Sequence, residues 1–280
     1  MQRRSFIKLI ALSSLLPAMP VMAMSKSDAL LSSEAKPEHK GLSEDYLKKM
    51  RHPDDIHRDD VSAALEERRM VEQLSVRLEG VQKFVGYRNF SVLSFDRMLR
   101  FGRRYSEIGP FDNVETDFLE KIFYEDALQY GFYGDKPLTK ITQSVKKRSI
   151  VKVPYTGQYL FKGKSLKLYT KLKQDIGDNI TLTSGVRSVV KQMHLFLRKA
   201  SQNEGNLSLA SRSLAPPGYS FHGVGDFDVG HVDLGAQNFT EAFAKTDEFK
   251  KLIDLGYINI RYLKDNELGV RFEPWHIKVL

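Results

Sequence analysis

The sequence predicts an α+β protein in which a small antiparallel sheet with flanking helices follows a helical N-terminal region. Three observations favour this class. Apolar residues recur at helical spacing in several segments, shorter runs rich in β-branched and aromatic residues lie between the helices of the second half, and the two kinds of segment do not alternate strictly. The 280 residues are 41% hydrophobic and 28% charged, which is typical of a folded globular chain.

The first 23 residues have the pattern of an export signal. A basic start is followed by a short apolar stretch and by small residues up to Ala23, where we expect cleavage. Arg3 and Arg4, followed by Ser-Phe-Ile-Lys, resemble the twin-arginine consensus, which would carry the protein across the membrane already folded. An ordinary secretory signal is the alternative. The rest of the chain has no apolar run long enough to span a membrane, so we expect a periplasmic protein without a transmembrane segment.

The chain contains no cysteine, which excludes disulfides, thiolate zinc sites and cysteine nucleophiles. Any metal must therefore be held by histidine and carboxylate side chains. The net charge is +8, and +5 without the signal, which suits an approach to polyanions. Because no nucleic-acid motif or long basic tract is present, the expected compartment favours cell-wall polymers over nucleic acid. The sequence carries no indication of the oligomeric state.

The chain after the signal divides into three parts by composition. Residues 24–60 are polar and predict a linker with one short helix at 45–50. Residues 61–105 predict a helical region, with helices over 61–84 and 91–105. Gly109-Pro110 then interrupts the pattern, and we expect the α+β domain over 106–280.

Each element of this last domain has its own signal. Asn113 is the expected N-cap of a helix, and Gly131 the expected C-cap glycine. Aromatic and β-branched residues predict strand structure at 150–162, and the Gly-, Ser- and Pro-rich residues 204–219 predict a flexible loop. The remaining predictions are helices at 166–176, 188–201 (capped by Ser188) and 240–255 (capped by Thr240), and strands at 221–232, 257–262 and 269–279, the last two as a hairpin with a turn at Asp265-Asn266.

The segment 220–230, SFHGVGDFDVG, carries the first candidate metal ligands. On a strand alternate residues share a face, so His222, Asp226 and Asp228 would point the same way. An imidazole and a carboxylate that converge in this manner are two thirds of a catalytic zinc site. His231 is an alternative ligand, but it lies past the glycine and on the opposite face.

The tetrapeptide Glu273-Pro274-Trp275-His276 carries the second set. Residues three apart on a regular strand face opposite sides, but Pro274 removes a hydrogen-bond donor and favours a bend. Glu273 and His276 can then converge, which gives a third metal ligand and a carboxylate free to act as a general base for zinc-activated water.

Arg187 lies where a strand end at Thr183-Ser184-Gly185 meets the helix capped by Ser188. A guanidinium at such a junction can hold a substrate carbonyl or carboxylate by a forked pair of hydrogen bonds.

These patches, in the order SGxRS…Q, SxHxxG…D-hydrophobic-G and ExWH, resemble the zinc D-alanyl-D-alanine carboxypeptidases and dipeptidases of the VanY/VanX type over residues 183–279. These enzymes belong to the LAS metallopeptidase superfamily, which also includes lysostaphin-type peptidases and the hedgehog signalling domain. The resemblance implies the following roles: zinc ligands His222, Asp228 and His276; general base Glu273; carbonyl-polarising Arg187; and substrate-side residues Ser220 and Gln192. Trp275 either lines the specificity pocket or packs beneath the metal.

One departure from the family pattern concerns the aspartate. The family has one more position between its first histidine and its aspartate than the six steps from His222 to Asp228. The Asp-hydrophobic-Gly ending favours Asp228 as the ligand. Asp226 is either the alternative ligand or a residue that orients a histidine.

The function that this pattern implies is a zinc metallopeptidase acting on peptidoglycan stem peptides, with D-alanyl-D-alanine carboxypeptidase activity first. An endopeptidase or dipeptidase of the same superfamily is one alternative. A non-catalytic, zinc-containing wall-binding module is another, because a fold alone does not determine function. The presence of both Glu273 and Arg187 argues against the module, since a structural metal site needs no base.

Overall fold

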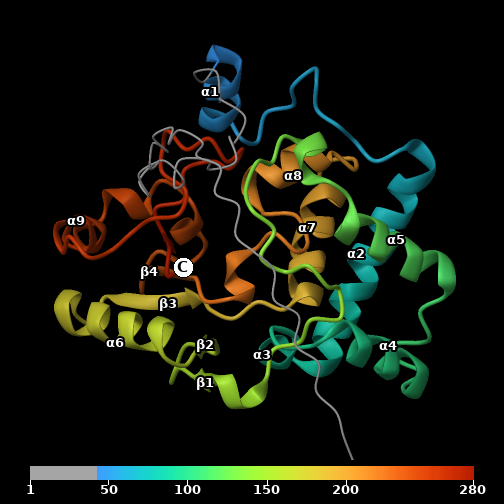
Figure 1. The fold of residues 1–280 in the computed structure, drawn as a ribbon, viewed down its shortest axis with the longest axis horizontal. Coiled ribbons are helices and arrows are strands. Elements are labelled where there is room, and N and C mark those ends of the chain that lie inside the picture. The colour runs from blue at the N-terminus through green and yellow to red at the C-terminus, as the bar shows by residue number, and fades with distance from the viewer. Residues whose placement is uncertain (1–42) are drawn as a thin grey trace, which may run out of the picture. The chain divides into compact units, whose positions relative to one another are not determined.

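The computed structural model describes residues 43–280 (Figure 1). The predicted export signal, its cleavage site and most of the expected linker lie outside these residues. Among the helices that the structure describes, none has the length and apolar character needed to cross a membrane. The predicted α+β class is confirmed, because helices surround two small antiparallel sheets.

The elements run as follows along the chain. The α-helices are α1 (Glu44–Arg51), α2 (Leu65–Val85), α3 (Tyr87–Phe90), α4 (Phe95–Arg104), α5 (Asn113–Tyr124), α6 (Lys164–Ile176), α7 (Val189–Ser201), α8 (Leu207–Ser213) and α9 (Asp247–Asp254). The strands are β1 (Ile150–Lys152), β2 (Tyr159–Phe161), β3 (Ile180–Ser184), β4 (Phe227–His231) and β5 (His276–Ile277). Short 3₁₀ helices are η2 (Ala127–Tyr130), η3 (Lys147–Ser149), η4 (Phe221–Gly223), η5 (Gly235–Phe239) and η6 (Phe243–Lys245).

Two hydrophobic cores lie on either side of the molecule. The helical core, on the right in Figure 1, is built where α2 packs against α7, and its buried side chains include Leu74, Leu78, Met193 and Phe196. The second core lies between the sheet and α6, on the left, and includes Phe227. The helical region predicted at 61–105 therefore shares its core with α7. The domain boundaries at 61 and 106 stay a prediction.

The three-stranded sheet brings polar side chains together on one face. Its order is β3-β4-β5, with all neighbours antiparallel. Ser184 pairs with Asp228, and Asp228 pairs with His276, so these three residues are direct cross-strand neighbours. Because side chains alternate along β4, Phe227 and Val229 enter the core while Asp228 points away from it.

The strand structure predicted at 150–162 is confirmed as the hairpin of β1 and β2. The carbonyl oxygen of Tyr159 accepts a hydrogen bond from the Val186 amide, 2.7 Å away. This contact brings β2 against Gly185, where an added Cβ would lie 2.0 Å from the same oxygen. A glycine is therefore required at this position, because any side chain would push apart the hairpin and the segment that carries Arg187.

The prediction of a flexible loop at 204–219 is wrong. Residues Leu207–Ser213 form helix α8, whose side chains are all buried. Asn206 caps the helix by accepting a hydrogen bond from the Leu209 amide, and Ser211 bonds the Tyr130 carbonyl. The small residues that suggested a loop instead let α8 pack closely beneath its neighbours.

The strand predicted at 221–232 begins only at Phe227. Phe221–Gly223 form the 3₁₀ turn η4, whose carbonyl at Phe221 accepts the amides of Val224, Gly225 and Asp226. His222 therefore does not share a strand face with Asp228. Asp228 itself lies on a strand, β4, as predicted.

The C-terminal predictions need similar corrections. The helix predicted at 240–255 is split into η6 and α9, and Thr246, not Thr240, caps α9. The predicted hairpin at 257–279 is reduced to β5 and one bridge between Ile260 and Ile277, because a turn at Pro274 and Trp275 interrupts the pairing.

The predicted caps have mixed outcomes. Ser188 caps α7 as predicted. The cap of α5 is Asp112, one residue before the predicted Asn113, and it forms a reciprocal capping box with Glu115. Gly131 adopts a left-handed conformation but follows η2, since α5 ends at Tyr124.

Candidate metal centre

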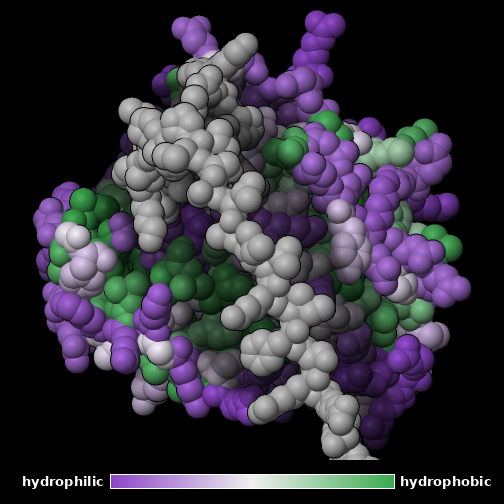
Figure 2. Space-filling model, in the orientation of Figure 1, coloured by the Kyte–Doolittle hydropathy of each residue, from purple (hydrophilic) through white to green (hydrophobic). Residues whose placement is uncertain are grey.

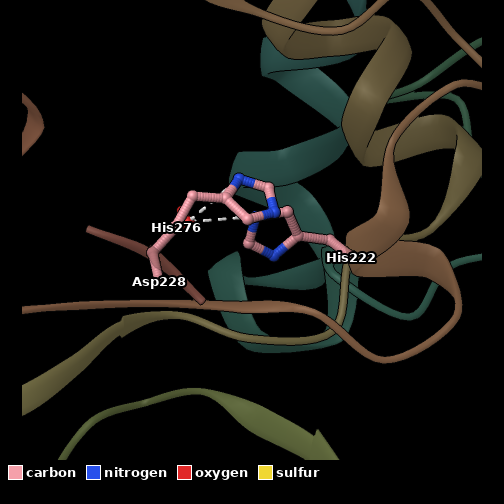
Figure 3. Close-up of side chains that lie close together, drawn as sticks. All are labelled: His222, Asp228 and His276. Atoms are coloured by element: carbon pink, nitrogen blue, oxygen red, sulfur yellow. Dashed lines mark ion pairs between the residues drawn. The ribbon is translucent and has the colours of Figure 1, made fainter. Parts of the chain in front are cut away.

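Three buried side chains from three elements meet at one point. His222 comes from the turn η4, Asp228 from β4 and His276 from β5. One ligand atom from each lies within 4.8 Å of the others. Figure 3 shows the two imidazole rings against each other with the carboxylate beside them, and the ring centroids are 4.8 Å apart.

Hydrogen bonds select which nitrogen each histidine offers. The Nδ1 of His222 lies 2.8 Å from the Gly185 carbonyl oxygen, which can only accept, so this nitrogen carries the proton. The Nε2 of His276 lies 3.1 Å from a carboxylate oxygen of Asp226 and is protonated for the same reason. The remaining ring nitrogens, Nε2 of His222 and Nδ1 of His276, both lie near Asp228 and would be the metal-binding atoms.

Asp228 supplies the third ligand atom. Its Oδ1 lies 3.2 Å from Nε2 of His222 and 3.6 Å from Nδ1 of His276. It is buried and has no hydrogen-bond donor in the described part of the chain, while Oδ2 accepts a bond from Arg187. A buried carboxylate oxygen without a donor, beside one nitrogen from each of two imidazoles, fits a divalent metal ion that would bind all three atoms.

The predicted bend at Pro274 is confirmed. The His276 amide donates to the Glu273 carbonyl, which closes a tight turn through Pro274 and Trp275. The turn brings a carboxylate oxygen of Glu273 to 3.3 Å from Nδ1 of His276. The buried carboxylate of Glu273 therefore lies beside the three candidate ligands.

Arg187 contacts the same centre from the opposite side. Its Nη2 lies 3.2 Å from both Nε2 of His222 and Oδ2 of Asp228, and donates to the Ser184 hydroxyl at 2.9 Å. Its Nη1 donates to Oε1 of Gln192, whose amide nitrogen in turn bonds the Ala215 carbonyl. Gln192 thus lies behind Arg187, and its predicted contact with substrate stays a prediction.

A buried arginine that the sequence patterns did not reveal supports the centre from behind. Arg261 forms an ion pair with Asp226, donates to the Leu280 carbonyl, and stacks with its guanidinium carbon 3.5 Å from the Phe221 ring centroid. Its own amide donates to the His276 carbonyl. Asp226 therefore orients His276 and is not among the grouped ligands. This is one of the two roles predicted for Asp226 from the sequence, and the contact of its carboxylate with Nε2 of His276, 3.1 Å away, supports it.

The burial of the centre shifts the pKa values of its groups. Burial and the adjacent Arg187 lower the pKa of His222, which favours its neutral, metal-binding form. Burial alone would lower that of His276, but hydrogen bonds with Asp226 and Glu273 outweigh it and raise its pKa to about 9. Burial would likewise raise the pKa of Asp228, yet the two imidazoles and Arg187 lower it.

The centre opens into a cavity of about 410 Å³ between the two cores. Ser220 and Trp275, both predicted to contact substrate, line it, as do Arg187 and Glu273. Trp275 also belongs to the sheet core, so it both lines the cavity and packs. On the face seen in Figure 2, hydrophilic side chains cover the periphery and hydrophobic ones gather nearer the middle.

The geometry agrees with a comparison against protein families. Residues 163–280 match the VanY family of D-alanyl-D-alanine carboxypeptidases. The VanY match includes β3, β4 and β5 and every residue of the centre described above. Helices α1 to α5 precede it.

Two solved structures are similar to part of the chain. One is the LD-carboxypeptidase LdcB, from a study of peptidoglycan recognition, at 26% identity over 52% of this chain and 65% of that one, with a TM-score of 0.36. The chain thus corresponds to less than two thirds of LdcB. The other is a variant of the D,D-pentapeptidase VanY from a VanB-type vancomycin resistance cassette in complex with Zn(II), at 17% identity over 54% and 88%, with a TM-score of 0.39. No curated protein matches the sequence significantly.

Proposed function

We propose that this protein is an exported zinc carboxypeptidase that removes the terminal D-alanine from peptidoglycan stem peptides. The observation that carries the proposal is the convergence of two imidazoles and one carboxylate on a cavity wall that also presents Glu273 and Arg187. A site built only to hold a metal has no use for the last two residues. The VanY match supports the peptide substrate and, through it, a location at the cell wall.

The metal ligands in this proposal are Nε2 of His222, Oδ1 of Asp228 and Nδ1 of His276. Two imidazoles and one carboxylate with an open fourth position are a common catalytic zinc set. Zinc held there would lower the pKa of water and polarise a carbonyl oxygen.

The protein's own groups would carry the proton and the charge. Glu273, 3.3 Å from His276, would accept a proton from the attacking water and deliver it to the leaving amine. Arg187, fixed by Ser184 and Gln192, would donate hydrogen bonds to the carbonyl oxygen as negative charge develops on it. Ser220 and Trp275 would form the wall against the leaving residue.

Replacement of Glu273 by Gln tests the mechanism. We expect hydrolysis to fall by roughly 10²–10⁴-fold, because the amide cannot accept the proton, while zinc still binds because Glu273 is not a ligand. Zinc content by atomic emission and D-alanine release should be measured on the same sample. Equal hydrolysis by Glu273→Gln and the native protein would contradict this mechanism, whereas zinc binding without hydrolysis by either protein would favour the wall-binding module.

The bond that is cut can be identified by mass spectrometry of defined muropeptides incubated with the zinc-loaded protein. A carboxypeptidase releases one D-alanine from the pentapeptide stem. Loss of a dipeptide, or cleavage of a cross-link with no loss of D-alanine, would contradict the carboxypeptidase assignment but keep the zinc peptidase.

A further inference from the structure

Helix α7 presents a row of basic side chains to the cavity. Lys191, Leu195, Arg198 and Lys199 all line it, and their spacing of four, seven and eight residues puts them on one helix face. Arg271 lines the cavity as well, with its guanidinium carbon 5.3 Å from the Trp275 ring centroid. The basic row is therefore continuous with the cavity that holds the candidate metal centre.

Among the described residues, only Lys199 of this basic wall has an ion-pair partner within 4.0 Å. The acidic residues lining the cavity are Asp228 and Glu273, and both belong to the metal centre. Lys199 is paired with the exposed Asp54 at 2.7 Å. Within residues 43–280, neither Lys191 nor Arg198 forms an ion pair.

Two of these basic groups are also partly withdrawn from water. The amine of Lys191 donates to Oε1 of Gln82, a neutral acceptor, at 2.7 Å. Burial, with Arg187 and Arg198 nearby, lowers the pKa of Lys191 to about 8, as expected for an ammonium group without a carboxylate beside it. The Nε of Arg271 is buried without a hydrogen-bond acceptor in the described chain. Burial of a cationic group without a carboxylate or other acceptor costs free energy in the protein alone. A bound anion would reduce that cost.

We propose that Lys191 and Arg198 form an anion-binding subsite that takes a side-chain or α-carboxylate of an acidic peptide on the N-terminal side of the scissile bond. The proposal rests on the peptidase function proposed above: that function places Ser220 and Trp275 against the leaving residue, and Lys191 and Arg198 lie on a different element, α7. Because the basic row and the candidate metal centre line the same cavity, a peptide with a carboxylate a few residues before the cut can contact both, whereas a free anion cannot. Arginine and lysine bind carboxylates by charge-assisted hydrogen bonds.

The test compares two peptides that differ only in charge. One is N-acetyl-L-Ala-γ-D-Glu-L-Lys-D-Ala-D-Ala with a free α-carboxylate on the glutamate, and the other carries an amide there. We expect a KM about tenfold lower for the acid, and a smaller difference at 0.5 M salt, because screening weakens exposed charge pairs. In the double variant Lys191→Met/Arg198→Met the difference in KM between the two peptides should vanish.

Lys250→Met is the matched control, because it removes one exposed lysine on α9 that does not line the cavity. It should keep the full preference for the acid. Equal KM for both peptides in the native protein, or a preference that survives in the double variant, would overturn the subsite.

A binding measurement separates this inference from the proposed function. Calorimetric titration of both peptides into zinc-loaded Glu273→Gln needs no turnover. If neither peptide is cleaved by the native protein but the acid binds about tenfold more tightly, the subsite stands and the carboxypeptidase assignment fails. If the two bind equally, the subsite fails whatever the activity.

Discussion

At the scale of single residues, the centre depends on side chains that fix the orientation of others. His222 and His276 each commit one nitrogen to an oxygen acceptor, at Gly185 and Asp226, and so offer the other nitrogen to Asp228. Hydrogen bonds of this kind fix the tautomer and the ring orientation of metal-binding histidines. Asp226 is in turn held by Arg261 and by the Val279 amide at 2.9 Å.

This chain of contacts predicts that Arg261 matters for metal affinity. Replacement of Arg261 by Met should weaken zinc binding by roughly 10–100-fold, because Asp226 loses its ion pair and holds His276 less firmly. Arg261→Lys should restore part of the affinity. Competition with a chromophoric chelator gives the zinc dissociation constant, and thermal unfolding of the zinc-free protein checks the fold. An unchanged dissociation constant in Arg261→Met would show that the arginine only supports the C-terminal segment.

At the scale of elements, helix α8 ties the N-terminal segment to the cavity. Arg212 on α8 is buried, and it bonds both carboxylate oxygens of Asp60 at 2.6 and 3.0 Å as well as the carbonyls of Pro53 and Asp55. Ser213 and the two residues after it line the cavity. The segment that the sequence predicted as a linker is therefore part of the support for the cavity wall.

Replacement of Asp60 by Asn should destabilise the protein by about 3–5 kcal/mol, because it leaves the Arg212 guanidinium buried without its counterion. The neighbouring Asp59→Asn is the control. Its carboxylate is exposed and pairs with Lys49, so we expect a change of less than about 1 kcal/mol. Urea unfolding followed by circular dichroism measures both, and equal effects would contradict the buried ion pair.

At the scale of the whole molecule, stability should depend on pH through His194 on α7. This side chain is fully buried, contacts the Phe90 ring edge-on, and neither ring nitrogen has a hydrogen-bond partner in residues 43–280. Burial, with Lys191 and Arg198 nearby, lowers its pKa to about 4. In the unfolded chain the pKa is about 6.5, so between these values only the unfolded state holds the proton.

The contribution of His194 to the free energy of unfolding is therefore fully present above about pH 6.5. As the pH falls toward 4, the free energy of unfolding decreases by on the order of 2–3 kcal/mol. His194→Leu should remove this loss without lowering stability at pH 7.5. Urea unfolding of zinc-free protein at pH 7.5 and 5.0 tests both statements. The same pH-dependent loss in native and variant protein would assign it to another group.

The sequence by itself determined the chemistry of the candidate site. The absence of cysteine restricted the ligands to histidine and carboxylate, and the order of the motifs singled out the residues that the structure brings together. Pro274 predicted the turn between Glu273 and His276, because a proline lacks the amide hydrogen that a regular strand would donate. Helices with a strong apolar period were also predicted nearly to their ends.

Only the tertiary structure decided how these residues converge and what surrounds them. Asp228 and Asp226 are only two positions apart. The pairing of β4 with β5 places Asp228 beside His276, whereas the ion pair with Arg261 holds Asp226 behind the ligand atoms. The buried helix α8 and the basic wall of α7 depend on partners up to about 150 residues away. Local sequence cannot encode such contacts, because they arise when distant segments pack around the two cores.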